Sequence, residues 1–192
     1  MAIEADKGQE VKKGKEQRDN LLLTNMDYKD VYQRSLAAYL GFAIGDALGA
    51  TTEFMRPHEI QTRYQIHKDL CGGGWLHLKP GKVTDDTEMS LALGDALVET
   101  GGINEVVIAE HFVKWMRSKP TDIGHTIRQG LSRFKLFRTT QAPYSEYAAS
   151  NGSLMRNLPV IIASIRDEKQ LDEWSTRQSI ITHNNTLALA GT

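Results

Sequence analysis

The sequence has 192 residues, of which 40% are hydrophobic and 24% are charged, and its net charge is −1. This length and composition predict one globular domain with a buried core. The balanced charge predicts no nucleic-acid partner. No apolar run resembles a signal peptide or is long enough to cross a membrane, so we expect neither export nor a membrane span. The single cysteine, Cys71, fits a reducing compartment, so we expect a cytoplasmic location.

The first 25 residues differ in composition from the rest. They contain the polar run KGQEVKKGKEQRDN, which has no apolar periodicity. Such a segment cannot bury enough apolar surface to fold alone, so residues 1–25 are expected to form a disordered extension. The folded domain is expected to cover residues 31–192.

Apolar residues from position 31 onward recur with a helical period, which predicts an all-α fold. The first expected helix contains SLAAYLGFAIGDALG, and another apolar helix begins at Asp85. Further helices are expected within 104–118, 123–134, 154–165 and 171–182. Strand signals are weak.

Three glycines on one face of the first helix require a reason. Gly41, Gly45 and Gly49 are spaced four apart, and each costs about 1 kcal/mol relative to alanine. We expect another backbone to approach this face closely. Asp46 lies in the same apolar helix and would need a polar partner if it were buried.

Two adjacent aspartates precede the helix in VTDDTEMSLALG, which runs from Val83 to Gly94. They are typical of a helix cap, with Glu88 in the position of a capping-box acid. They are equally typical of a site for a hard divalent cation, since adjacent carboxylates repel one another unless a cation lies between them. The Thr84 and Thr87 hydroxyls complete an all-oxygen set, and Glu53 ends the glycine-rich helix. The two interpretations are compatible, and we expect this helix end to serve both roles.

A glycine-rich run, CGGGW, lies at 71–75. Its backbone amides could surround a phosphate. It lacks the lysine and serine of a P-loop, so a turn is favoured.

Several blocks occur in an order that resembles the ADP-ribosylglycohydrolase family, from about Ser35 to Asn185. They are GDALGATTEFM, GGGWLHLKPGKVTDDTEMSLALG, PTDIGHT, APYSE, NGSLMRNLP and ITHN. The resemblance implies a roughly orthogonal helix bundle that holds two divalent ions, Mn²⁺ or Mg²⁺. It also implies hydrolysis of the N-glycosidic bond between ADP-ribose and a protein arginine. Dinitrogenase reductase is the protein substrate that this resemblance suggests, and ADP-ribose is the expected small-molecule ligand.

The resemblance assigns roles to particular residues. Thr84, Asp85 and Asp86 match the family's metal ligands, while Glu53 and Asp122 match its acidic residues at the reacting centre. Cleavage requires a proton for the departing guanidinium and a positioned water molecule. One carboxyl group can donate the proton, and a second can position the water. The expected substrate-binding residues are His125, Asn151, Gly152, Ser153, Met155 and His183. His125 stands where a close relative within the family has asparagine, which leaves its role open.

The family's second Asp-x-Asp metal motif has no counterpart in this chain. Two octahedral ions need about twelve ligand positions before bridging is counted, so the second ion is in doubt. The chain is therefore expected to be either part of a hydrolase or a truncated relative. A truncated relative could bind ADP-ribose, or act with a partner protein, without hydrolysing the bond.

Overall fold

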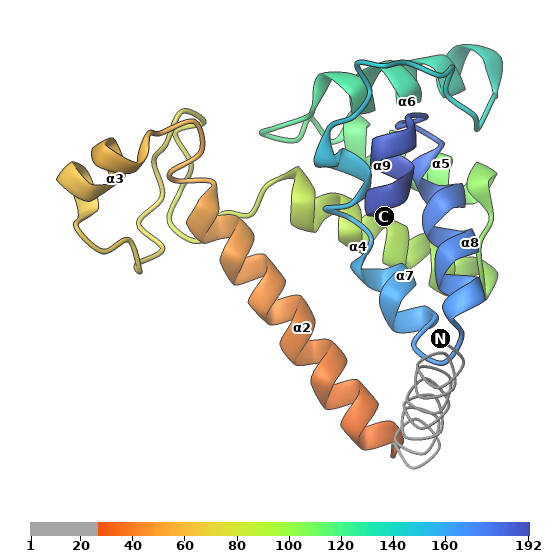
Figure 1. Cartoon of the computed structure of the whole chain (residues 1–192), viewed down its shortest axis with the longest axis horizontal. Coiled ribbons are helices and arrows are strands. Elements are labelled where there is room, and N and C mark those ends of the chain that lie inside the picture. Colours follow the sequence, from red (N-terminus) through yellow and green to blue (C-terminus); the bar gives the residue numbers. More distant parts are fainter. Residues whose placement is uncertain (1–26) are drawn as a thin grey trace, which may run out of the picture. The chain divides into compact units, whose positions relative to one another are not determined.

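The computed structural model of the chain describes residues 27–192 (Figure 1). The predicted extension at 1–25 lies outside the described residues. The helices are α2 (Tyr28–Gly49), α3 (Pro57–Tyr64), α4 (Asp85–Thr100), α5 (Glu105–Arg117), α6 (His125–Phe137), the 3₁₀ turn η1 (Asn151–Ser153), α7 (Leu158–Ala163), α8 (Glu168–Ser179) and α9 (Thr186–Gly191). Within this part of the chain, β pairing is limited to one bridge between Gly73 and Leu78. The predicted all-α fold is confirmed.

Residue contacts divide the chain into two units within α2, after Ala38. The second unit, Tyr39–Thr192, contains all the residues that the sequence predicts for the site. The domain start expected at residue 31 stays a prediction. No helix in 27–192 combines the length and the apolar character needed to cross a bilayer.

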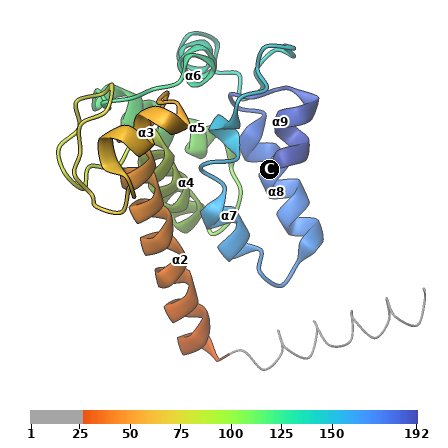
Figure 2. The same ribbon diagram turned by 60° about the vertical axis from the view of Figure 1, so that its left-hand side comes forward.

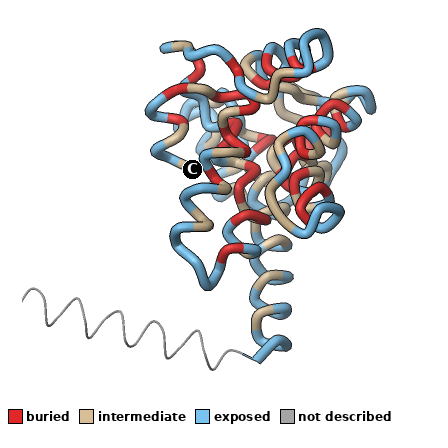
Figure 3. The backbone as a smooth tube through the Cα atoms, turned by 90° about the vertical axis from the view of Figure 1, so that its right-hand side faces the viewer, coloured by how far each residue is buried: buried red, intermediate tan, exposed pale blue. Residues whose placement is uncertain are grey.

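The core of the second unit is built around α4, which packs against α5 and α7, while α5 also packs against α6 and α8 (Figure 2). Buried residues lie both in these helices and in the segments that join them (Figure 3). The fully buried apolar side chains of this core include Met89, Leu93, Ile108, Phe112, Leu131, Phe134 and Val160. The core thereby fixes the beginning of α4, where the two aspartates lie.

Helix α5 follows its sequence prediction closely. The Asn104 side chain caps it by accepting hydrogen bonds from the backbone N–H groups of Val106 and Val107, at 3.1 and 3.2 Å. Ile108 and Phe112 are fully buried on one face of the helix, as their spacing predicts.

The helix predicted within 154–165 is shorter than expected. The chain first forms the turn η1, and α7 begins only at Leu158, with Pro159 in its first turn. The short helices α3 and α9 were not predicted. Pro57 opens α3, and the Glu59 carboxylate accepts a 2.6 Å hydrogen bond from the Arg56 backbone N–H. Eight residues with little apolar periodicity give only a weak helix signal.

Gly130 of α6 allows close contact with the chain that follows α8. A Cβ atom at this position would lie 2.8 Å from the Thr182 Cα atom and 3.0 Å from the Ile181 carbonyl oxygen. Because backbone atoms cannot move aside cheaply, Gly130→Ala should lower the free energy of unfolding by about 2 kcal/mol. Urea denaturation measures this loss, with the exposed neighbour Gln129→Ala as the control. Equal stability of the two variants would show that α6 is free to shift.

Candidate functional site

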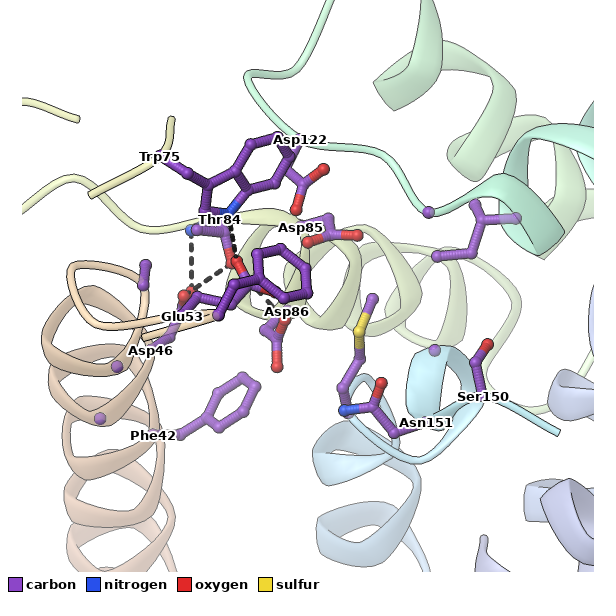
Figure 4. A pocket seen from close by; sticks show the side chains of 18 of the residues that line it. Phe42, Asp46, Glu53, Trp75, Thr84, Asp85, Asp86, Asp122, Ser150 and Asn151 are labelled. Carbon is purple, nitrogen blue, oxygen red and sulfur yellow. Dashed lines mark hydrogen bonds between the residues drawn. The ribbon is translucent and has the colours of Figure 1, made fainter. Parts of the chain in front are cut away.

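A cavity of about 820 Å³ lies where the C-terminal end of α2 meets the N-terminus of α4 (Figure 4). Its size is typical of small-molecule sites. Five carboxyl side chains line it, and no lysine or arginine is among the described residues of its wall. The acidic residues are Asp46, Glu53, Asp85, Asp86 and Asp122.

Asp46 of α2 caps helix α4 from outside. Its carboxylate accepts hydrogen bonds from the backbone N–H groups of Thr84 and Thr87, at 2.9 and 3.2 Å. It also accepts from the hydroxyl groups of both threonines, at 2.7 and 2.6 Å. The polar partner that Asp46 needs is therefore the first turn of α4, and these bonds hold the two helices together at the cavity.

The predicted capping by the two aspartates is wrong. Thr84 is the N-cap residue of α4, while Asp85 and Asp86 occupy the first turn. Glu88 closes no capping box, because its carboxylate accepts hydrogen bonds from Lys82 and, at 2.8 Å, from the Trp115 indole. Since Asp46 satisfies the helix end, the adjacent carboxylates remain available to the cavity (Figure 4).

The crowding of acidic groups changes their ionisation. Burial, followed by the charges of Asp122 and Asp86, raises the pKa of Asp85 to about 7. Burial, followed by the charge of Asp46, raises the pKa of Asp86 to about 6, and Glu53 adds to this rise. Both carboxyl groups would therefore gain from a cation placed between them.

Glu53 is held at the cavity by Trp75. The indole N–H donates a 2.8 Å hydrogen bond to a Glu53 carboxylate oxygen, and the ring packs edge-on against Phe54 with centroids 5.4 Å apart. The turn before Trp75 requires Gly74, which has φ +68° and lies so close to the end of α2 that a Cβ atom would be 2.8 Å from the Ala50 carbonyl oxygen. The run CGGGW is thus a tight turn that places Trp75 beside Glu53.

The glycine face of α2 does not contact another backbone, so that prediction is wrong for the described residues. A Cβ atom at Gly41, Gly45 or Gly49 would meet no atom within 4 Å. All three glycines line the cavity instead. The absence of side chains on this face leaves the cavity open.

The predicted substrate-binding residues fall into two groups. His125, Asn151, Gly152 and Met155 line the cavity. Ser153 and His183 are fully buried and are not part of its wall. His183 contacts the wall through Ser150, whose hydroxyl lies 2.8 Å from the His183 Nε2 atom.

The donor chemistry of the cavity suits a hard divalent cation, but its geometry is incomplete. Thr84, Asp85, Asp86 and Glu53 offer only oxygen atoms, as Mn²⁺ and Mg²⁺ prefer. However, no three His, Cys, Asp or Glu side chains within 27–192 converge closely enough to hold an ion. The described residues therefore offer oxygen donors suited to such a cation but do not form a complete set of ligands.

Several wall residues were missed or left without a role in the sequence predictions, among them Asp46, Trp75 and Ser150. The signal for Asp46 was a charged residue within an apolar helix. Trp75 lies within a recognised motif and Ser150 directly precedes one, and nothing in their spacing indicates a contact with the cavity.

Comparison with known proteins decides the family. The profile described as ADP-ribosylglycohydrolase matches residues 27–192. The chain belongs to the ADP-ribosylglycohydrolase family. A solved structure, an ADP-ribosylglycohydrolase-related protein complex, matches at a TM-score of 0.72 with 31% identity, over 84% of this chain and 53% of that chain.

Curated relatives of the family match most of this chain. The ADP-ribosyl-[dinitrogen reductase] glycohydrolase of Rhodospirillum rubrum is 50% identical over 82% of the chain and 54% of its own length. The ADP-ribosylarginine hydrolase Tri1 of Pseudomonas putida is 36% identical over 79% of the chain and 42% of its own length. The chain thus spans about half the length of these relatives.

Proposed function

We propose that this ADP-ribosylglycohydrolase chain supplies the acidic wall of a metal-dependent site that hydrolyses ADP-ribosyl-arginine on a protein. The observation that carries the proposal is the convergence of five carboxyl groups on one cavity of suitable size. Identity of 50% to the Rhodospirillum rubrum glycohydrolase makes ADP-ribosylated dinitrogenase reductase the expected substrate.

Glu53 and Asp122 are the proposed catalytic residues. Hydrolysis of an N-glycosidic bond needs one group to position or deprotonate water and another to support the departing guanidinium. Both side chains line the cavity, and Asp122 is close enough to Asp85 for its charge to raise the pKa of that carboxyl group. Glu53 is oriented by the indole of Trp75.

Thr84, Asp85 and Asp86 are the proposed protein ligands of a divalent ion. Such an ion would orient ribose hydroxyls and a water molecule, and would stabilise developing charge. The Thr84 hydroxyl donates its proton to Asp46, so the lone pairs of the Thr84 oxygen remain free to bind an ion. Ligands beyond these three would have to come from Glu53, water, substrate or other polypeptide.

The remaining wall is proposed to hold the ADP-ribose. Asn151, Gly152 and Met155 lie on or beside η1, and His125 begins α6. Ser153 and His183 support this wall from the interior. A Cβ atom at Gly152 would be 2.7 Å from the His183 ring, so only glycine permits this packing.

A second candidate function is ADP-ribose binding without hydrolysis. The incomplete set of converging metal ligands within 27–192 favours it. This function would require the wall around η1 but not the ion.

The deciding experiment incubates the 192-residue chain with Mn²⁺ and an arginine-ADP-ribosylated protein, and measures free ADP-ribose. The matched control is the Asp85→Asn, Asp86→Asn double variant, which keeps the side-chain size and removes both charges. Release by the chain and at least a hundredfold slower release by the variant would support hydrolysis. Absence of release, together with calorimetric binding of ADP-ribose, would favour the second function.

A further inference from the structure

A row of buried polar side chains lies behind η1. It begins at Arg156, which is fully buried and stacks on the Phe112 ring, with its guanidinium carbon 4.5 Å from the ring centroid. It continues through Thr182 and His183 and ends at Ser150 on the cavity wall. The hydrogen-bond partners of Arg156 within 27–192 are Gln178 and Thr182, neither of them acidic. A buried cation without an acidic partner is costly, so the position of Arg156 needs an explanation.

The contacts along the row form a continuous hydrogen-bonded chain. The Arg156 Nη2 atom donates to the Thr182 hydroxyl oxygen at 2.9 Å. That oxygen lies 2.8 Å from His183 Nδ1, and His183 Nε2 lies 2.8 Å from the Ser150 hydroxyl oxygen. Gln178 fixes the start of the chain, because its side-chain and backbone oxygens accept from Arg156 at 2.7 and 2.9 Å.

Arginine gives this chain a direction. A guanidinium can only donate, so the Thr182 oxygen must accept from Arg156. The Thr182 proton is then free to point to His183 Nδ1, the one other partner of this hydroxyl among residues 27–192. The opposite direction would leave the buried Thr182 proton without an acceptor. Burial and the Arg156 charge also lower the pKa of His183 to about 3, so the ring carries a single proton at neutral pH.

We infer that Arg156 is a positioning residue that fixes His183 as its Nε2–H tautomer and makes Ser150 a hydrogen-bond donor to the cavity. With Nε2–H donating to the Ser150 oxygen, the hydroxyl proton of Ser150 is free for an acceptor other than His183. The Ser150 hydroxyl can then donate to an acceptor atom of a ligand, either oxygen or nitrogen. The choice of ADP-ribose as that ligand rests on the proposed function, whereas the tautomer does not.

This donor complements the rest of the cavity. The opposite wall holds Asp46 and Glu53 (Figure 4), and no lysine or arginine side chain lines the described cavity. The carboxylates would repel oxygen-rich parts of a ligand, whereas the Ser150 hydroxyl would donate a hydrogen bond to them. The buried guanidinium polarises the hydrogen-bonded chain without placing a positive charge in the cavity.

The tautomer is measured by long-range ¹H–¹⁵N correlation spectra of the ¹⁵N-labelled chain, with His183→Gln used to assign the signals. We expect the Nε2–H form of His183 throughout pH 5 to 8. Arg156→Lys, which retains a donor, should keep this form, and Arg156→Met should show both tautomers. An Nδ1–H form in the wild type, or a ring that titrates within this range, would overturn the inference. If Arg156→Met does not fold, the spectra of the wild type and of Arg156→Lys still show which tautomer His183 adopts.

Binding of ADP-ribose tests the role of Ser150 separately. Ser150→Ala should weaken binding about tenfold, as expected for one lost hydrogen bond, while the exposed Ser132→Ala control should not. Arg156→Lys, which preserves the direction of the chain, should bind within about twofold of the wild type. Undiminished binding by Ser150→Ala would overturn the donor role. If the wild type does not bind ADP-ribose, the proposed function fails, and the spectra still decide the direction of the chain.

Discussion

Replacing Asp46 by alanine is expected to lower the free energy of unfolding by about 3 kcal/mol. The change removes the acceptor of four hydrogen bonds, two from backbone N–H groups at the start of α4 and two from threonine hydroxyls. An N-cap interaction contributes about 1 kcal/mol, and buried donors left without a partner add to the loss. The same change should separate α2 from α4 and deform the cavity.

Urea denaturation at pH 7 measures the Asp46 effect. The control is Asp95→Ala, because Asp95 is an exposed aspartate on α4 itself. Asp46→Asn should fall between the wild type and the alanine variant, since the amide retains one acceptor oxygen. A loss for Asp46→Ala no larger than for Asp95→Ala would mean that the first turn of α4 is held by other contacts.

The second large effect concerns pH. In the folded chain the pKa of Asp85 is about 7, compared with 3.8 for an unperturbed aspartate. Between these values the folded protein binds more protons than the unfolded chain, so the free energy of unfolding falls as pH rises. Asp85→Asn removes this loss. At pH 8 the variant should be about 2 kcal/mol more stable than the wild type, and the difference should shrink towards pH 4.

The pH prediction is checked by denaturant titrations at pH 4, 6 and 8 without divalent ions. Asp172→Asn, an exposed aspartate of α8, provides the matched control. If Asp85→Asn raised the free energy of unfolding most at pH 4, the result would contradict the prediction, because the charge of Asp85 destabilises the fold only at higher pH. Equal stability at pH 8 would mean that water reaches Asp85 freely.

Local sequence patterns predict most of the helices. Helix α5 was predicted because its apolar residues repeat at helical spacing, and the structure adds that Asn104 caps its first turn. Helix α7 was misjudged because the apolar spacing from Leu154 to Ile165 takes no account of the irregular backbone around η1. Periodicity reports which residues favour burial but does not report where a backbone turn interrupts a helix.

The site was only partly predictable for a related physical reason. The adjacent carboxylates at 85 and 86 indicated where the acidic groups gather. However, the residue that caps the helix is Asp46, which lies 38 positions before Thr84. The glycine face of α2 indicated that side chains are excluded there. It did not indicate whether another backbone or an open cavity lies opposite this face. Such pairings depend on how helices meet, and a local pattern does not encode them.

The most direct test of the account locates ADP-ribose on the chain. Amide chemical shifts of the ¹⁵N-labelled protein are followed as ADP-ribose is added in the presence of Mg²⁺. The account predicts saturable shifts centred on the cavity, at Gly49, Asp86, Gly124 and Gly152. No saturable shift, or shifts confined to the groove between α6 and the loop around Ala142, would contradict the assignment of the carboxylate cavity as the ADP-ribosyl site.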